Sequence, residues 1–441
     1  MTAVPAPLSV LHVSQPTHGG VAVYVVQAVR EQIRRGWRVA VACPAEGELA
    51  ADLAAAGIEH LPWRARRSPG PGMLGEALEL GAAIGRFDPD VVHLHSSKAG
   101  LVGRLPLVAR NRRVIFQPHG WSWLAAGGAQ GRASLLWERA AARRADALVC
   151  VGQGELDQGR RAGVRGAAHL IRNGVDRRRF HRMDAGARTA ARAELGLPED
   201  APVAVCVGRV TRQKGQDVLL DAWPRIRARC PRAVLALVGD GDAVDRLRER
   251  SEAGVMFVPA VADTRRWLAA STVMVLPSRW EGLPLTALEA LAAGRSLVAT
   301  GIPGLAEVVT PGTGALVAVE DPAGLAEAVA ARLLDPALAD AEGAAAAMGA
   351  AAFDAAVTFA RLADLTYGLV GEAPVDGAGV VAGVRGAGEP GAGGGPLPAG
   401  AEGVEDAAVA EADVDRVGAG RGVPLVDGSE GVGVGSGASG G

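Results

Sequence analysis

A regular alternation of short apolar segments with helix-type segments limits the fold of this chain more than any other feature. Segments 8–13, 203–207 and 272–277 are short and almost continuously apolar, as parallel strands buried on both faces are. Each is followed by a loop and then by a helix-type segment, for example 21–34. Strands that alternate with helices in this way predict α/β domains with doubly wound parallel sheets.

The length allows two such domains, because 441 residues that are 49% hydrophobic can bury two separate cores. We expect a first Rossmann-like domain over 1–175 and a second over 176–350, facing each other across a cleft. A terminal helix over 351–370 is expected to cross back onto the first domain. Residues 371–441 are rich in glycine, acidic and without any aromatic residue, so we expect this tail to be disordered.

The formal net charge of −2 conceals an uneven distribution. Residues 1–180 carry 24 basic and 14 acidic side chains, residues 181–370 carry 19 and 23, and residues 371–441 carry 3 and 11. A basic first half fits an anionic membrane surface or an anionic acceptor. Nucleic acid would fit the charge equally well, but no recognition helix, zinc finger or aromatic-basic signature is found, so we expect no nucleic-acid partner.

The cysteines and the hydropathy suggest where the protein works. The four cysteines are scattered without a C-x-x-C pair, which is typical of reduced thiols in the cytoplasm. No apolar run reaches the roughly 18 residues that a membrane-spanning helix needs. We expect a cytoplasmic protein whose basic half leaves open a peripheral contact with the inner face of the membrane.

The segment 277–294 places two carboxylates around a helix start. Glu281 lies just outside the expected helix and Glu289 about one and a half turns inside it. The N–H groups of Gly282 and Leu283 lie at the positive end of the helix dipole, where a diphosphate can bind. Taken alone, Glu-x7-Glu is more often a pair of solvated acids. Carboxylates that flank an anion site, however, suit the hydroxyl groups of a nucleotide sugar.

A second candidate is the loop after strand 203–207, which carries Arg209 and Lys214 between two glycines. Two cations five residues apart at the carboxyl end of a strand can hold a diphosphate, Arg as a planar fork and Lys as a point charge. A loop with two cations is otherwise more often only solvated.

The first half carries weaker candidates at the ends of its strands. Gly19 and Gly20 let the backbone approach a ligand. His119 follows a strand beside a glycine, at the edge where open α/β sheets bind ligands. Ser96 suits the N-cap of a helix that we expect to continue, with Arg104 and Arg110, as far as residue 113; such a helix fits a membrane surface as well as ordinary packing.

A lysine and a pair of histidines in this stretch each allow a functional and a structural interpretation. Lys98 could meet an acceptor phosphate, although a surface lysine is the more frequent case. His93 and His95 share one face of a strand, but without a third ligand placed by spacing we expect packed or hydrogen-bonded histidines, not a metal site.

The motifs together resemble the family 4 glycosyltransferases, retaining enzymes of the GT-B fold. The resemblance covers about residues 8–370 and rests on Glu281-x7-Glu289, on Gly-Arg-x4-Lys-Gly over 208–215, on Pro-His-Gly over 118–120 and on Asn-Gly-Val-Asp over 173–176. His-Ser-Ser-Lys-Ala-Gly over 95–100 is similar to members that build bacterial surface polysaccharides.

The resemblance implies roles for these residues. Arg209, Lys214, Gly282 and Leu283 would hold the donor diphosphate, near the glycine loop of Gly19 and Gly20. Glu289 would bind the ribose, and Glu281 and His119 the sugar. The implied reaction moves a hexose from a nucleotide-diphosphate sugar, UDP-hexose before GDP-mannose, to a glycan or lipid-linked acceptor, with no cofactor and no metal. The alternatives are a nucleotide-sugar epimerase, a phosphorylase, for which no pyridoxal-phosphate lysine is evident, and a non-catalytic sugar-nucleotide-binding subunit.

Overall fold

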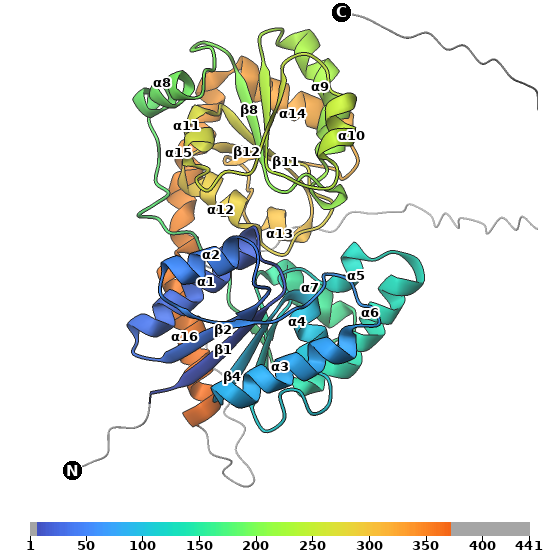
Figure 1. Cartoon of the computed structure of the whole chain (residues 1–441). Coiled ribbons are helices and arrows are strands. Elements are labelled where there is room, and N and C mark those ends of the chain that lie inside the picture. Colours follow the sequence, from blue (N-terminus) through green and yellow to red (C-terminus); the bar gives the residue numbers. More distant parts are fainter. Residues whose placement is uncertain (1–6, 372–441) are drawn as a thin grey trace, which may run out of the picture. The chain divides into compact units, whose positions relative to one another are not determined.

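The computed structural model describes residues 7–371, so the tail predicted to be disordered lies, from residue 372 onward, outside the described residues. Two parallel sheets organise the described part of the chain (Figure 1). The first has seven strands in the order β3-β2-β1-β4-β5-β6-β7. Its strands are β1 (Ser9–Ser14), β2 (Arg38–Cys43), β3 (Glu59–Pro62), β4 (Val91–His95), β5 (Arg113–Gln117), β6 (Ala147–Cys150) and β7 (Ala168–Leu170).

The second sheet has six parallel strands in the order β10-β9-β8-β11-β12-β13. Its strands are β8 (Val203–Val207), β9 (Val234–Val238), β10 (Val255–Val258), β11 (Val273–Leu276), β12 (Ser296–Thr300) and β13 (Gly314–Val317). In both sheets the order reverses beside the first strand, between β1 and β4 and between β8 and β11. Ligands of open α/β sheets bind at the carboxyl ends of the strands at such a switch point.

Helices connect the strands, as parallel pairing requires. Those of the first half are α1 (Gly20–Arg34), α2 (Glu48–Ala55), α3 (Met73–Phe87), α4 (Ser96–Gly103), α5 (Ser122–Ala125), α6 (Gly128–Ala141) and α7 (Gln153–Arg161). Those that follow are α8 (Ala185–Glu194), α9 (Gln216–Arg229), α10 (Val244–Glu249), α11 (Arg265–Ala270), α12 (Leu285–Ala292), α13 (Pro303–Ala306), α14 (Pro322–Leu334) and α15 (Pro336–Gly349). Short 3-10 turns are η1 (Ala142–Arg144), η2 (Arg212–Lys214) and η3 (Ala350–Phe353).

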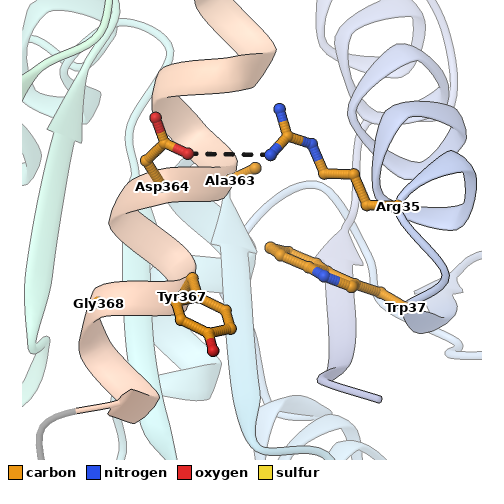
Figure 2. Close-up of a pocket in the computed structure, with 6 residues that line it drawn as sticks. All are labelled: Arg35, Trp37, Ala363, Asp364, Tyr367 and Gly368. Carbon is orange, nitrogen blue, oxygen red and sulfur yellow. Dashed lines mark ion pairs between the residues drawn. The ribbon is translucent and has the colours of Figure 1, made fainter.

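The last helix, α16 (Ala355–Gly371), packs on the first sheet, where Phe359 and Leu362 share a core with Tyr24 of α1. Figure 2 shows the surface beside it: Arg35 lies 3.8 Å from the carboxylate of Asp364 at the edge of a pocket of about 310 Å³. This pocket is lined only by residues of α16 and of the α1–β2 connection, so it lies apart from both switch points.

The long basic helix expected after β4 is wrong. Helix α4 ends at Gly103, and Pro106 follows within one turn, where its missing N–H and its ring are incompatible with a continuing helix. Leu107 and Asn111 then adopt φ of 77° and 62°. Ser96 does not cap the helix either, since no side-chain hydrogen bond caps its start. Among residues 7–371 no helix is long and apolar enough to cross a bilayer.

Candidate functional site

Two loops of the second sheet come together at the switch point between β8 and β11. A Cβ added to Gly215 would lie 2.0 Å from the carbonyl oxygen of Pro277, and Gly215 has φ of 69°. Only glycine allows this close approach together with this backbone conformation. The contact brings the cationic loop after β8 against the loop that precedes α12.

Lys214 and Glu281, which are 67 residues apart, form the centre of this site. The Nζ atom of Lys214 donates to Glu281 Oε1 over 2.6 Å, and Ser278 Oγ donates to the same oxygen over 2.9 Å. The side chains of Lys214 and Glu281 are only 14% and 8% exposed. Two predicted site residues therefore form a largely buried ion pair, which holds both charged groups at one place.

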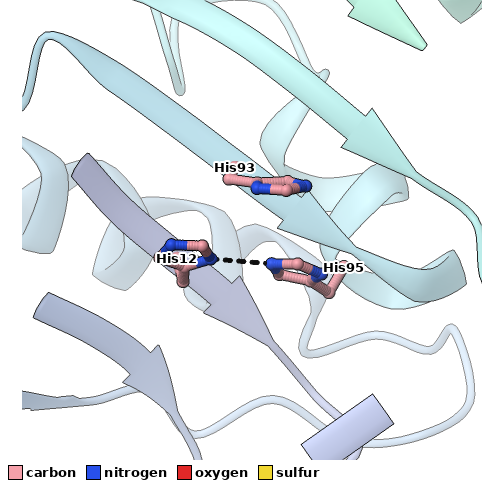
Figure 3. Close-up of side chains that lie close together, drawn as sticks. All are labelled: His12, His93 and His95. Carbon is pink, nitrogen blue, oxygen red and sulfur yellow. Dashed lines mark hydrogen bonds between the residues drawn. The ribbon is translucent and has the colours of Figure 1, made fainter. Parts of the chain in front are cut away.

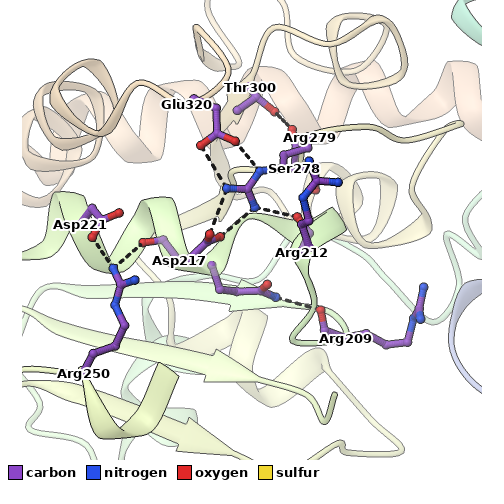
Figure 4. A network of polar contacts seen from close by, with 10 residues as sticks. Arg209, Arg212, Asp217, Asp221, Arg250, Ser278, Arg279, Thr300 and Glu320 are labelled. Carbon is purple, nitrogen blue, oxygen red and sulfur yellow. Dashed lines mark hydrogen bonds and ion pairs between the residues drawn. The ribbon is translucent and has the colours of Figure 1, made fainter. Parts of the chain in front are cut away.

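A polar network of neighbouring residues in the same two loops links one loop to the other (Figure 4). Arg279 donates to the carbonyl oxygen of Arg212 over 2.7 Å and to both carboxylate oxygens of Asp217 over 2.9 and 3.0 Å. On the other side, Gln216 Nε2 donates to the carbonyl oxygen of Arg209 over 3.0 Å. These bonds fix the backbone on either side of Lys214.

Arg209 is half-buried, and its guanidinium lies 3.4 Å from Gln213 Oε1. Burial lowers the pKa of Arg209, and the nearby charge of Arg67, from the first half, lowers it further. A cation that is partly desolvated and close to a second cation is stabilised by a bound anion. Burial and the charge of Arg67 therefore favour a bound anion beside Arg209, whereas the nearby carboxylates of Glu281 and Asp242 oppose it.

The start of α12 offers further donors. Neither the Gly282 nor the Leu283 amide donates a hydrogen bond to another group of residues 7–371, and both precede an eight-residue helix whose dipole favours negative charge. Glu289 lies within α12, where burial raises its pKa to about 7 despite a 3.4 Å contact from Thr264 Oγ1.

Loops of the first sheet meet this helix start. A Cβ at Gly20, the first residue of α1, would lie 3.8 Å from Leu285 Cδ1 of α12. His119 and Gly120 have φ of 53° and 102°, and a Cβ at Gly282 would lie 3.2 Å from the Gly120 nitrogen. The structure therefore brings the glycine loop, His119 and Glu281 to one place from two different sheets.

Glu155, on α7, was missed by the sequence analysis. Its carboxylate accepts from the Gly120 nitrogen over 2.5 Å and from the Val151 nitrogen over 2.7 Å, and burial raises its pKa to about 7. The buried carboxylate thereby anchors the turn that carries His119. A lone Glu in a helix that reads as amphipathic gives no sequence signal for such a role.

Two contacts join the halves beside the site. Asn173 Nδ2 donates to the Leu283 carbonyl oxygen over 2.7 Å. Glu307 accepts from the Gly154 nitrogen over 2.7 Å and from Arg172 Nε over 3.2 Å. Asn173 begins the Asn-Gly-Val-Asp motif, which places it at the connection, but its contact with the α12 loop was not predicted.

The histidine pair on β4 has a third neighbour that spacing could not reveal (Figure 3). His12 of β1 is in register with His93, and ligand-type atoms of His12, His93 and His95 lie within 4.8 Å of one another. His12 Nδ1 and His95 Nε2 are joined by a 2.8 Å hydrogen bond with ring planes 14° apart, and His93 stacks on His95 at 4.0 Å. At 2.8 Å, His12 Nδ1 and His95 Nε2 lie closer to each other than two nitrogen ligands of one tetrahedral zinc, which are about 3.4 Å apart when each Zn–N distance is about 2.1 Å. The arrangement favours a hydrogen-bonded cluster.

Lys98 has a structural partner. It is 4% exposed, and its Nζ donates to Glu76 Oε2 over 2.9 Å and to the Ser68 carbonyl oxygen over 3.1 Å. Glu76 also accepts from the Arg66 nitrogen. This pair anchors the 66–68 loop, which favours a structural role for Lys98 over the contact with an acceptor phosphate. Arg104, on a segment that fitted a membrane surface as well as ordinary packing, is buried against Glu138.

Comparison with known proteins decides the family. Residues 18–179 match the family described as Glycosyltransferase Family 4, and residues 201–335 match the one described as Glycosyl transferases group 1. A D-inositol 3-phosphate glycosyltransferase of Catenulispora acidiphila is 33% identical over 356 residues, which cover 72% of this chain and 83% of that protein. The chain belongs to the family 4 glycosyltransferases. An α-maltose-1-phosphate synthase of Mycolicibacterium smegmatis is 30% identical over 72% of this chain and 87% of its own length.

Solved structures agree with the GT-B fold of this glycosyltransferase. Sucrose-phosphate synthase of Thermosynechococcus elongatus superposes with a TM-score of 0.71 at 24% identity, over 82% of this chain and 99% of that one. Anabaena HepE in complex with UDP and glucose superposes with a TM-score of 0.72 at 22% identity, over 82% and 99%. The predicted family, the predicted fold and the prediction of a transferase are therefore confirmed.

Proposed function

We propose that this glycosyltransferase moves a hexosyl residue from a nucleotide-diphosphate sugar to a glycan or lipid-linked acceptor in cell-surface polysaccharide or glycolipid synthesis, with retention of anomeric configuration. The observation that carries the proposal is the Lys214–Glu281 pair beside Arg209 and the free amides of α12. It puts two cations, helix-terminal N–H groups and a sugar-binding carboxylate within one small region.

In this mechanism Arg209, Lys214 and the α12 amides stabilise the charge that develops on the leaving diphosphate. Donor binding transfers Lys214 from Glu281 to the phosphate oxygens, and this frees Glu281 to accept hydrogen bonds from the sugar. Glu289 accepts from the ribose, and His119 reaches the sugar from the first sheet. Since no side chain is assigned as a nucleophile, the leaving phosphate helps to deprotonate the acceptor. Arg209, Lys214 and the amides before α12 supply the positive charge that the leaving diphosphate needs, so we assign no metal and no cofactor to the transfer.

We propose UDP-hexose as the donor before GDP-mannose, and the names of similar proteins include both nucleotides. HepE has been solved with UDP-glucose, whereas a relative in Corynebacterium glutamicum, 32% identical over 51% of this chain, is named as a GDP-mannose-dependent mannosyltransferase. The names of relatives also include acceptors that bear phosphate, such as D-inositol 3-phosphate. A phosphate-bearing or lipid-linked acceptor fits the excess of basic residues in the first half. The same excess, with four free cysteines, supports work at the cytoplasmic face of a membrane.

The test offers UDP-, GDP- and dTDP-hexoses with lipid-linked and phosphorylated acceptors, and determines the anomeric configuration of the product by NMR. We expect transfer from a UDP-hexose to give a product with the anomeric configuration of the donor. Inversion would refute the proposed retention of configuration, and with it a mechanism in which the leaving phosphate helps to deprotonate the acceptor. Interconversion of donor sugars without an acceptor would favour an epimerase, and tight donor binding without turnover on any acceptor would favour a binding subunit.

Donor binding can be followed apart from turnover, because the chain has only two lysines, Lys98 and Lys214. In protein labelled with ¹³C at lysine Cε, UDP should shift the Lys214 resonance and leave that of Lys98 unchanged. An unchanged Lys214 resonance at saturating UDP would contradict the proposed exchange of partners.

A further inference from the structure

A chain of hydrogen-bonded side chains runs from α1 through the first sheet to His119. Gln32 Oε1 lies 2.8 Å from His12 Nε2, and His12 Nδ1 lies 2.8 Å from His95 Nε2. His95 Nδ1 lies 3.0 Å from His119 Nε2. Gln32, His12 and His95 are between 0 and 2% exposed, so no solvent competes for these bonds. The chain leads from a glutamine far from the donor loop to the histidine beside it.

The imidazole rings of His12, His95 and His119 are neutral at physiological pH. Burial lowers the pKa of His12 to about 4 and that of His119 to about 3. Burial also lowers the pKa of His95, and the neighbouring histidines lower it further. A neutral imidazole has one N–H donor and one bare acceptor nitrogen. The direction of one hydrogen bond therefore determines the direction of all the others.

The amide oxygen of Gln32 sets this direction. An oxygen only accepts, so His12 carries its proton on Nε2 and leaves Nδ1 bare. His95 then donates from Nε2 to His12, and His119 donates from Nε2 to His95 Nδ1. His119 Nδ1 is left without a proton. Within residues 7–371 this atom makes no hydrogen bond, and it is not among the fully buried polar atoms.

We propose that Gln32 is a positioning residue that fixes the tautomer of His119, so that its bare Nδ1 accepts a hydrogen bond from one hydroxyl of the donor sugar. This inference rests on the proposed function, in which His119 contacts that sugar. It makes Gln32, His12 and His95 determinants of donor specificity, although none of them touches the substrate. A sugar with a hydroxyl at this position is favoured. A deoxy sugar lacks the donor, and a carboxylate or keto group would place an acceptor against an acceptor.

The tautomers can be read directly by ¹⁵N NMR of histidine-labelled protein, without any assay of transfer. The signals of His12, His95 and His119 are assigned by substituting each in turn. We expect all three rings to carry the proton on Nε2 and none on Nδ1 at pH 7.5. Protonation of His119 on Nδ1, or exchange between its two tautomers, would overturn the proposal even if the enzyme transfers sugar normally.

Two substitutions of Gln32 separate hydrogen-bond direction from packing. Gln32→Glu keeps an oxygen acceptor for His12, whereas Gln32→Met has a similar volume and removes it. We expect His119 to keep its tautomer in Gln32→Glu and to lose the single tautomer in Gln32→Met. The thermal midpoint of each variant is measured alongside, so that an unfolded variant is not mistaken for an altered tautomer.

Kinetics with matched donors complete the test. In wild type and Gln32→Glu, the deoxy analogue of the donor hydroxyl in question should lower kcat/KM about tenfold, as the loss of one hydrogen bond does. In Gln32→Met this preference should shrink toward unity, and in His119→Ala the Gln32→Met substitution should have no further effect on it. An unchanged preference for the hydroxyl in Gln32→Met would overturn the proposal. If no donor turns over at all, the proposed function fails, and the NMR result still decides the tautomer.

Discussion

Glu289 shows at the scale of one residue how burial sets a working pH. Burial raises its pKa to about 7, so below pH 7 the carboxyl is protonated and loses half of its acceptor capacity. If it binds the ribose as a carboxylate, the donor KM rises as the pH falls below about 7, by up to about tenfold per pH unit. We expect Glu289→Gln to raise KM above pH 7, to approach the wild-type KM at lower pH, and so to flatten this dependence between pH 6 and 8.5. An equally steep profile in Glu289→Gln would assign the titration to another group.

Lys98 can be tested through its partner. Lys98→Met leaves the carboxylate of Glu76 buried without its cation, which costs about 3 to 5 kcal/mol of unfolding free energy. The double variant Lys98→Met with Glu76→Gln should recover most of that stability, measured by urea unfolding. Transfer activity should recover with it, since the role of Lys98 is structural. A stable double variant whose acceptor KM stays high would instead favour a contact between Lys98 and a phosphate of the acceptor.

The sequence singled out Glu281 and Lys214 as candidates, but it could not predict that they pair. Glu281 and Lys214 stand in local motifs, but a local motif does not show that two side chains 67 residues apart share a hydrogen bond. Their approach depends on β8 and β11 being neighbours and on Gly215 touching Pro277. His12 is the single histidine of strand β1, but its partner Gln32 lies on a helix whose rotation the sequence does not fix.

At the scale of elements, the contact of the α12 loop with the His119 turn depends on the absence of a side chain at Gly282. A Cβ there would lie 2.9 Å from Val151 Cγ2 and 3.2 Å from the Gly120 nitrogen. Gly282→Ala should therefore shift the loop by a few tenths of an ångström or more and lower kcat/KM by at least about tenfold, because transition-state contacts depend on such distances.

The matched control is Gly81→Ala in the interior of α3, where nothing lies within 4 Å of the added Cβ. Alanine in a helix interior is favoured over glycine by about 0.5–1 kcal/mol, so this variant should gain stability and keep full activity. Equal activity in the two variants would show that the Gly282 contact does not matter for transfer.

The alternation of strands and helices was predictable because both parallel sheets are buried and their strands are continuously apolar. Helix α4 was predicted too long because the leucine, valine and arginine side chains after Gly103 gave an amphipathic pattern. Pro106 prevents the helix from continuing, because it lacks the N–H of a helical hydrogen bond and its ring clashes with the preceding turn. The buried ion pair of Arg104 with Glu138 could not be predicted either. As with Lys214 and Glu281, the partners are distant in the sequence and meet only through tertiary packing.

For the whole molecule, the buried titratable groups predict acid lability. His12, His93, His95 and His119 have lowered pKa values because burial disfavours their charged forms, so the stability they contribute is complete above pH 6.5 and is lost as the pH falls toward about 4. Glu155 and Glu289 act in the opposite direction: their contribution is present below pH 4.5 and is lost as the pH rises through about 7. Four histidines outnumber two carboxyls, so unfolding takes up about two protons net in the window between.

Unfolding free energy should therefore fall by at most about 3 kcal/mol per pH unit between pH 6.5 and 4.5. Urea titrations at pH 7.5, 6.5 and 5.5 measure this slope. Stability that is constant from pH 7.5 to 5.5 would show that the four histidines are not buried as neutral rings.

The claim that the Lys214–Glu281 loop is the donor site is tested most directly by release of nucleoside diphosphate from a UDP-hexose in the presence and absence of acceptor. The wild type should show release that acceptor stimulates. Glu281→Gln loses a charge-assisted hydrogen bond, worth about 1.5–3 kcal/mol, and should lower acceptor-dependent release by about 10- to 100-fold. The substitution also leaves Lys214 without its anion, so the thermal midpoint of the variant is measured alongside to show that it is folded. Acceptor-stimulated release that is equal in wild type and a folded Glu281→Gln would contradict the account.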